Sequence, residues 1–401
     1  MRHAVIAVLL LIAAALAVGA EPITIGETVK IQSKILGEER TILISTPANY
    51  AQSQEKYPVL YMTDGDAHLT HTRGTVDFLA RNGVMPNLII VAVTNTDRTR
   101  DLSPTRGSRR LPDGTTQPIP NSGGAAKFLD FFDKELFPYV EGNYRTEPYR
   151  IFAGHSLGGL LSLYILTTRP ELFNAYIAAS PALTWDDDYI LARMSGFLEG
   201  RKELARTLFV TMANEEEADP KPDRFDRLCT MLGNAKAAGF VWGCMRMPEE
   251  NHGTVVLRTH YYGLRKFYEG WRLSFGTPTV PFSMTFTEIK QHYAALSKRF
   301  GYDVLPPEQI VNQAGYLLLA QNRTDDAIAV FRGNAELYSG AANVYDSLAE
   351  ALERAGRTEE ALANYNKAVE TANKTGDRRL EIFTANRDRA VAAAKERKPS
   401  P

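Results

Sequence analysis

The chain has 401 residues, of which 44% are hydrophobic and 23% are charged, and its formal net charge is −1. This length favours two domains, and the composition is that of a globular protein rather than of a disordered chain. Positive and negative side chains are interspersed, so nucleic acid and anionic membrane surfaces are not expected as main partners.

The N-terminus has the pattern of a secretory signal peptide. Arg2 and His3 precede an apolar stretch over residues 4–18, and small residues follow up to Ala20. This stretch is shorter than the roughly 20 apolar residues that a membrane-spanning helix needs. We therefore expect residues 1–20 to be cleaved off after Ala20, which predicts a periplasmic or secreted protein without a membrane span.

Between residues 24 and 275, short β-like runs alternate with helical stretches. The expected strands cover residues 29–35, 40–46, 58–63, 87–94, 150–153, 175–179, 207–212 and 240–247. The expected helices include residues 124–137, 157–168 and 224–238. The central strands are nearly continuous apolar runs, which is typical of strands covered by helices on both faces. The alternation predicts a mostly parallel α/β sheet with its active site at the carboxyl ends of the strands.

After Trp271 the sequence becomes helical, with expected helices over residues 287–299 and 378–396. The segment AGYLLLAQNRTDDAIAVF recurs 34 residues later as LAEALERAGRTEEALANY, which is typical of tetratricopeptide repeats. We therefore expect a hydrolase-like domain over 21–275, a linker and bridging helix over 276–306, and an all-α helical-repeat domain over 307–401. This tail is expected to bind a protein or peptide partner, to cover the catalytic face, or to pair two chains.

The motif GHSLGG places Ser156 between a predicted strand and a predicted helix. A serine on such a strand-to-helix turn is typical of a nucleophile, because Gly154 and Gly158 keep side chains out of the crowded turn. The alternative is a purely structural glycine turn. In a serine mechanism, the N–H of Leu157 at the start of the helix serves as one oxyanion donor.

A general base and an orienting acid are expected after later strands. His252 lies in a turn directly after the strand 240–247, where the base of such a site is expected. The acidic turn NEEEAD follows the strand 207–212, and a turn of three residues after Ala213 favours Glu216 as the acid. The other acidic residues of this turn remain alternatives, namely Glu215, Glu217 and Asp219.

The second oxyanion donor is expected in the loop after the strand 58–63, where the backbone N–H of Asp66 is the candidate and that of Gly65 is the alternative. His68 and His71 follow in the same loop and, with Asp64 and Asp66, could be interpreted as a metal site. A serine mechanism requires no ion, and we expect neither a metal nor a cofactor.

The segments YPVLYMTDGD, NTDRTRDLSPT, GHSLGGLLSLY, SPALTW and PEENHGTVV together resemble the esterase branch of the α/β-hydrolase superfamily. That branch contains esterase D and the enterobactin-type siderophore esterases, and the resemblance covers residues 24–272. It implies hydrolysis of small-molecule carboxylic esters, with Ser156, His252 and an acid near Glu216 in the usual roles. A scaffold or binding protein acting through the helical tail, or an acyltransferase with the same residues, are the alternatives.

Two further features leave alternatives open. Arg98 and Asp101 are interpreted as a structural ion pair, and the basic loop over 95–122 either recognises an anionic ester or is simply solvated. Its arginines are Arg98, Arg100, Arg106, Arg109 and Arg110. The two cysteines, Cys229 and Cys244, would meet an oxidising compartment after export, so a disulfide and two free thiols are both possible outcomes.

Overall fold

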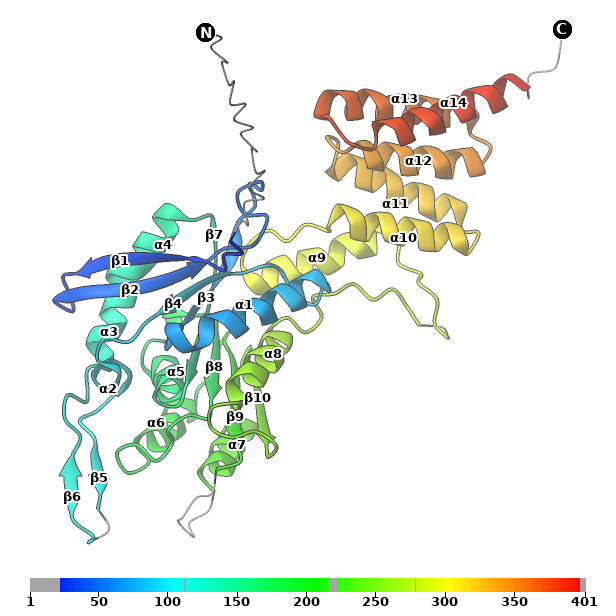
Figure 1. Ribbon diagram of the computed structural model, residues 1–401. Coiled ribbons are helices and arrows are strands. Elements are labelled where there is room, and N and C mark those ends of the chain that lie inside the picture. The colour runs from blue at the N-terminus through cyan, green and yellow to red at the C-terminus, as the bar shows by residue number, and fades with distance from the viewer. Residues whose placement is uncertain (1–21, 112, 216–222, 278, 397–401) are drawn as a thin grey trace, which may run out of the picture.

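The computed structural model describes residues 22–111, 113–215, 223–277 and 279–396. An α/β region forms the N-terminal part of the chain, and an array of helices forms the C-terminal part (Figure 1). The expected signal peptide, residues 1–20, lies outside the described residues. Among the helices that are described, none combines the length and the apolar composition needed to cross a membrane.

The α/β region is built on one sheet of eight strands in the order β1-β2-β4-β3-β7-β8-β9-β10. The bounds of these strands are β1 Glu27–Ser33, β2 Glu38–Ser45, β3 Tyr57–Met62, β4 Ile89–Val93, β7 Thr146–His155, β8 Ala175–Ala179, β9 Thr207–Ala213 and β10 Val241–Met247. β2 pairs antiparallel with β1 and β4, and the strands from β4 to β10 are parallel. The predicted α/β fold with a mostly parallel sheet is confirmed, and all eight expected strands are present.

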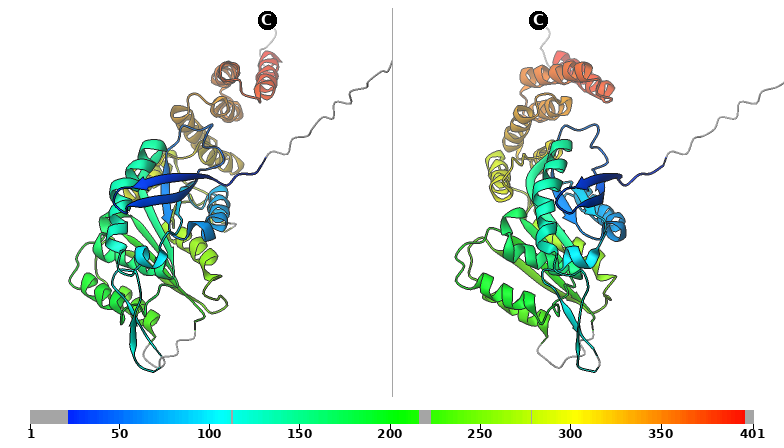
Figure 2. Two further views of the ribbon diagram at one scale, coloured as in Figure 1. Left: turned by 60° about the vertical axis from the view of Figure 1, so that its left-hand side comes forward. Right: turned by 90° about the vertical axis from the view of Figure 1, so that its left-hand side faces the viewer.

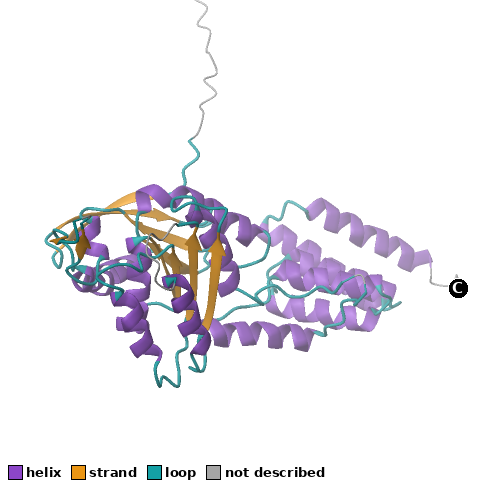
Figure 3. Cartoon of the chain, turned by 90° about the horizontal axis from the view of Figure 1, so that it is seen from below, coloured by secondary structure: helices purple, strands orange, loops and turns teal. Residues whose placement is uncertain are grey.

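Helices cover both faces of the sheet, as Figure 3 shows. One face carries α1 Gly65–Arg81 and α8 Val255–Phe267. The other carries α2 Arg98–Leu102, α3 Ala125–Phe131, α4 Phe137–Asn143, α5 Leu157–Thr168, α6 Tyr189–Leu198 and α7 Arg224–Asn234, with a π-helical turn Phe132–Leu136 between α3 and α4 and a 3-10 turn Pro170–Leu172 after α5.

Successive residues of a strand point to opposite faces, and this separates the two apolar cores. In β3, Leu60 and Met62 belong to the core under α1 and α8, whereas Val59 and Tyr61 belong to the core on the other face. Because both faces are buried, the strand is apolar at every position. This is the physical reason for the continuous apolar runs in the sequence.

Two elements differ from the sequence-based expectations. The segment after β3 was expected to be a loop, but α1 begins at Gly65, so that Asp66, His68 and His71 lie on a helix. In the basic loop over 95–122, the short strands β5 Ser108–Arg110 and β6 Thr116–Pro118 form an antiparallel hairpin. The helix expected over 124–137 is present as α3, the π-helical turn and the start of α4.

The C-terminal region is entirely helical and extends away from the sheet (Figure 2). Its helices are α9 Phe286–Phe300, α10 Glu308–Ala320, α11 Thr324–Leu337, α12 Ala342–Arg354, α13 Thr358–Thr375 and α14 Leu380–Glu396. The pair α10–α11 and the pair α12–α13 recur with the 34-residue period of the sequence. Their assignment to tetratricopeptide repeats, and the domain limits 21–275, 276–306 and 307–401, stay predictions.

Helix α9 attaches the helical region to the sheet region through aromatic side chains. The ring centroid of Phe300 lies 5.0 Å from those of Tyr149 and Tyr268. Lys298 of the same helix lines a cavity of about 380 Å³ together with Arg206, which immediately precedes β9. Tyr149 lies in the first half of β7, so α9 docks at the amino ends of the strands. The helical array is thus attached at the side of the sheet formed by the amino ends of the strands, which is opposite to the side formed by their carboxyl ends.

A disulfide links the last strand of the sheet to a neighbouring helix. Cys229 in α7 and Cys244 in β10 are bonded, with their Cα atoms 6.0 Å apart. Of the two alternatives left by the sequence, the structure therefore has the disulfide. It joins two elements that are consecutive in the chain, α7 and β10, across the loop between them.

Candidate active site

The turn between β7 and α5 consists of Ser156 alone. β7 ends at His155 and α5 begins at Leu157. The backbone of Ser156 has φ 59° and ψ −114°, a strained conformation for a residue with a side chain. Its N–H donates to the carbonyl oxygen of Ala179 in β8 at 3.0 Å, and its own carbonyl accepts from the N–H of Leu160 at 2.9 Å. The adjacent strand and helix therefore hold the strained residue in place.

Glycines make this turn sterically possible. A Cβ atom on Gly154 would lie 2.0 Å from the carbonyl oxygen of Gly158. A Cβ atom on Gly158 would lie 2.4 Å from Oγ1 of Thr63 in the turn after β3. At Gly154 the clash is with backbone, so this position does not accept a side chain, whereas a side chain at Gly158 would require the hydroxyl of Thr63 to move. The close packing that the glycines allow is thus what builds the turn at Ser156.

His252 lies in a tight turn between β10 and α8. The side-chain oxygen of Asn251 accepts hydrogen bonds from the N–H groups of Gly253 and Thr254, each at 3.0 Å. The hydroxyl of Thr254 accepts from the N–H of Asn251 at 3.0 Å. These bonds fix the backbone on both sides of His252, whose side chain is 47% exposed.

The imidazole of His252 is bonded to a carboxylate from the acidic turn. Its Nδ1 lies 2.7 Å from Oε1 of Glu215. The N–H of Asn214 donates to the carbonyl oxygen of Glu250 at 2.9 Å, which ties the acidic turn to the histidine turn. The hydrogen bond to Glu215 raises the pKa of His252, although burial opposes this. Burial alone would raise the pKa of Glu215, but hydrogen bonds with His252 and Ser180 lower it overall.

Glu216, the acid that the sequence favoured, lies outside the described residues, as do Glu217 and Asp219. The strand β9 ends at Ala213, one residue beyond the expected strand 207–212 and at the residue from which the three-residue turn was counted. The carboxylate bound to His252, however, is two residues beyond that point rather than three. Glu215 was among the alternatives, and its hydrogen bond makes it the candidate acid.

A second histidine contacts the His252 turn. His155, the residue before Ser156, lies with its Nε2 2.7 Å from the carbonyl oxygen of His252. Because a carbonyl oxygen only accepts, Nε2 of His155 carries the proton. Burial and the neighbouring His252 lower the pKa of His155 to about 4, so this side chain is neutral near pH 7. No role for His155 could be predicted from the sequence, because a position next to the serine says nothing about contacts with a distant turn.

Two helix N-termini supply the candidate oxyanion donors. Leu157 is the first residue of α5, and Asp66 lies in the first turn of α1. The first N–H groups of a helix have no partner within that helix, so both are available to a ligand. Gly65 lies so close to β4 that a Cβ atom would be 2.8 Å from the backbone of Ala92. This contact places the start of α1 against the carboxyl end of β4.

Arg98 connects the turn before α1 to the turn at Ser156. Its Nε and Nη2 donate to the carboxylate of Asp64 at 2.6 and 3.1 Å, and Nη2 also donates to the carbonyl oxygen of His155 at 3.1 Å. The expected ion pair between Arg98 and Asp101 was therefore wrong. Asp101 binds Arg40 from β2 instead, because its side chain points into the buried space behind α2.

The histidines of α1 pair with each other rather than with the acids around them. Nδ1 of His68 lies 3.1 Å from Nε2 of His71. Burial lowers the pKa of His68, and it lowers that of His71 to about 4. Within the described ranges, no three histidine, cysteine, aspartate or glutamate side chains are arranged to hold a metal ion.

Comparison with known proteins identifies the family of this fold and site. Residues 33–221 match the family model described as "Putative esterase". The chain is 30% identical over 264 residues to the siderophore triacetylfusarinine C esterase of Aspergillus fumigatus, covering 59% of this chain and 90% of that protein. It is 33% identical over 196 residues to the ferri-bacillibactin esterase BesA of Bacillus subtilis, covering 45% and 66% of the two chains.

Solved structures show the same relationship. An IroE-like serine hydrolase from Shewanella oneidensis superposes with a TM-score of 0.66 at 28% identity, covering 78% of this chain and 99% of its own. An uncharacterised protein from Capnocytophaga ochracea shares the fold, with a TM-score of 0.65 at 16% identity over 90% of this chain and 99% of its own. The resemblance predicted from the sequence is thus confirmed. The chain belongs to this esterase family of α/β hydrolases, and it is a carboxylic-ester hydrolase.

Proposed function

We propose that the enzyme cleaves its ester through an acyl-enzyme on Ser156, with His252 as general base and Glu215 as the orienting acid. The observation that carries this proposal is the hydrogen bond of 2.7 Å between His252 Nδ1 and Glu215 Oε1, beside the strained turn of Ser156. Because Nδ1 is bonded to the carboxylate, Nε2 is the nitrogen left to accept a proton from the serine.

The reaction then proceeds in two halves. Ser156 Oγ attacks the ester carbonyl carbon while His252 takes the hydroxyl proton, and the N–H groups of Leu157 and Asp66 bind the resulting oxyanion. The carbon–oxygen bond to the alcohol breaks as His252 protonates the leaving oxygen. Water then attacks the acyl-enzyme, His252 accepts a proton from it, and the acid is released as the proton returns to Ser156.

We propose a siderophore ester as the substrate. Support comes from the two relatives described above, of which one is named a siderophore triacetylfusarinine C esterase and the other a ferri-bacillibactin esterase. The exposed Arg106 in the basic loop is consistent with an anionic group on the substrate. Rates on a panel of siderophore, acyl, feruloyl and peptide esters test this assignment.

We also propose that the enzyme acts after export, with Glu21 as the first residue of the mature chain. The signal-like N-terminal sequence supports this, and the disulfide between Cys229 and Cys244 is of a kind that persists in oxidising compartments. The intact mass of the exported protein tests the cleavage after Ala20.

The mechanism is tested by replacing Ser156 with alanine. Hydrolysis of short p-nitrophenyl esters and labelling by a fluorophosphonate probe are both expected to be lost. Ser162 provides a matched control, because it lies on the same helix with a buried hydroxyl that has no hydrogen-bond partner in the described part of the chain. Ser162→Ala should retain activity and labelling. Full activity in Ser156→Ala would rule out the proposed nucleophile.

A further inference from the structure

One guanidinium group contacts both segments from which the oxyanion donors of the proposed mechanism arise. Arg98 binds Asp64, which lies two residues before Asp66, and it binds the carbonyl oxygen of His155, which lies two residues before Leu157. The two segments belong to different strand-to-helix turns, after β3 and after β7. Just before these turns, the backbone joins the two segments through the N–H of Thr63, which donates to the carbonyl oxygen of Ala153 at 3.3 Å.

The contact with His155 bears directly on the conformation of Ser156. The peptide bond between His155 and Ser156 has its carbonyl oxygen bound by Arg98 at 3.1 Å and its N–H bound by Ala179 at 3.0 Å. The peptide plane is therefore fixed from both sides. Since the orientation of this plane sets φ of Ser156, the two bonds together maintain the strained value of 59°.

The contact with Asp64 supports the other turn in the same way. Asp64 is buried and has a left-handed backbone with φ 55° immediately before α1. Such a conformation is unfavourable for a residue other than glycine unless its surroundings hold it. The carboxylate accepts hydrogen bonds from Arg98 and, at 2.6 Å, from the side-chain amide of Asn95. These bonds anchor the side chain and thereby the first turn of α1.

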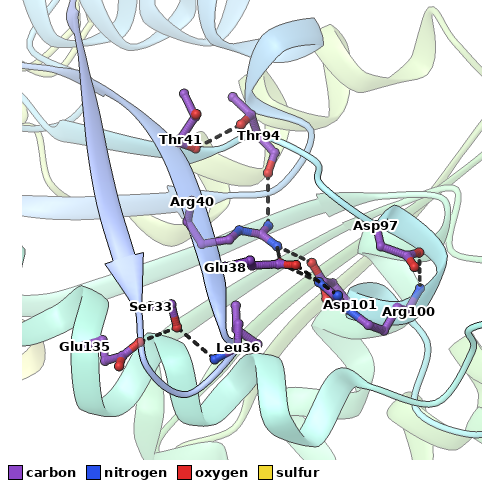
Figure 4. A network of polar contacts seen from close by, with 10 residues as sticks. All are labelled: Ser33, Leu36, Glu38, Arg40, Thr41, Thr94, Asp97, Arg100, Asp101 and Glu135. Carbon is purple, nitrogen blue, oxygen red and sulfur yellow. Dashed lines mark hydrogen bonds and ion pairs between the residues drawn. The ribbon is translucent and has the colours of Figure 1, made fainter.

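Arg98 itself extends from a rigid support. It is the first residue of α2, and Asp101 of that helix is 2% exposed and binds Arg40 at 2.5 Å and Arg100 at 2.7 Å. Glu38 binds the same two arginines at 2.9 and 2.5 Å. Figure 4 shows this network between β2 and α2. The short helix is thus fixed to the sheet by the buried ion pair of Asp101 with Arg40 and by the partly exposed pair of Arg100 with Glu38.

We propose that Arg98 is a positioning residue that keeps the two oxyanion N–H groups at a fixed separation. The inference rests on the proposed mechanism at Ser156. Two of the guanidinium nitrogens, Nε and Nη2, bind the two turns, so we assign the effect of Arg98 to the position of these turns rather than to contact with the substrate. Small displacements of oxyanion donors weaken binding of the transition state more than binding of the ester.

The test uses the full-length mature protein and a neutral short-chain p-nitrophenyl ester, so that charge on the substrate plays no part. Arg98→Lys retains the positive charge but lacks the planar fork from which two separate nitrogens, Nε and Nη2, bind Asp64 and His155. We expect kcat to fall about tenfold to a hundredfold, with KM within about twofold of the wild-type value. The rate of labelling by a fluorophosphonate should fall by a similar factor.

Arg98→Ala provides a second test, in which the activity of one variant is compared with and without added guanidinium. Addition of guanidinium at millimolar concentration should restore part of kcat, because the free ion can occupy the place of the missing group. A variant that lost activity only through general destabilisation would not recover in this way.

Arg169→Lys is the matched control. Arg169 follows the far end of α5, its side chain is 27% exposed against 33% for Arg98, and it binds Asp133 at 2.6 Å. Its replacement should leave kcat within about twofold of wild type.

The outcomes separate this inference from the proposed function. If wild-type enzyme reacts with the probe but Arg98→Lys retains full kcat, the inference is overturned while the mechanism stands. A rise in KM at constant kcat also overturns it, because that result indicates a substrate contact. If the wild-type enzyme does not react with the probe at all, the mechanism fails and the inference fails with it.

Discussion

The substitution Glu215→Gln is expected to weaken the enzyme and to shift its pH dependence. Glutamine keeps the shape and an acceptor oxygen for Nδ1 of His252 but removes the negative charge. A hydrogen bond to a charged group contributes about 1.5–3 kcal/mol, against about 0.5–1.5 kcal/mol for a neutral one. The side chains of His252 and Glu215 are 47% and 34% exposed, so solvent screening places the loss at the lower end, about 1 kcal/mol. This corresponds to a fall of about fivefold in kcat/KM at neutral to alkaline pH.

The direction of the pH shift follows from the same contact. His252 acts as a base only when it is neutral, so activity rises with pH through its pKa, which Glu215 raises above 6.5. Without the carboxylate the imidazolium is less stable and the pKa falls. The acid limb of the kcat/KM profile should therefore move to lower pH, and the difference between the variant and wild type should narrow as the pH is lowered.

The assay is the pH profile of kcat/KM on a p-nitrophenyl ester for wild type, Glu215→Gln and two comparison variants. Glu249→Gln changes a carboxylate in the histidine turn that binds Arg258 rather than His252, and it should leave the profile unchanged. Glu216→Gln tests the acid that the sequence favoured. If Glu216→Gln moves the acid limb and Glu215→Gln does not, the assignment of Glu215 is refuted.

Two further predictions concern stability. Replacement of Arg40, which is 1% exposed, by methionine leaves the buried Asp101 with one cation fewer and should lower the free energy of unfolding by about 3–5 kcal/mol. The control Lys30→Met removes a cation from the exposed pair with Glu39 and should leave the thermal midpoint unchanged. Equal midpoints for the two variants would contradict this reasoning. Reduction of the disulfide, which spans 15 residues of sequence, should lower the free energy of unfolding by about 3 kcal/mol, and the double variant Cys229→Ser/Cys244→Ser should no longer respond to reductant in a urea titration.

The sheet could be predicted from the sequence because its strands are buried on both faces. Segments such as 87–94 and 207–212 are apolar at nearly every position, and few other environments produce that pattern. α1 could not be predicted in the same way. It buries polar residues, among them Thr72 and Arg73, whose partners are His260 and the carbonyl oxygen of Leu88. Because such hydrogen bonds allow polar residues at buried positions, the apolar residues of this helix do not recur with the helical period that would have predicted it.

In the candidate site, too, some residues could be predicted from the sequence and others could not. Ser156 and His252 each follow a strand, and in a parallel sheet this is sufficient to predict that both lie at the carboxyl ends of the strands. The choice between Glu215 and Glu216 depends on the path of a turn over one residue, which spacing alone does not determine. The pairing of Arg98 with Asp64 joins segments that are separated in the sequence. A local spacing such as that between Arg98 and Asp101 gives no information about it.

The attachment of α9 at the amino ends of the strands has a practical consequence. Helix α14, the last described helix, lies at the far end of the helical array, away from the strands of the sheet (Figure 1). The enzyme can therefore be immobilised on a solid support through a C-terminal tag without obstructing the approach of a bulky ester. The α-helices between the tag and the sheet serve in that setting as a built-in spacer.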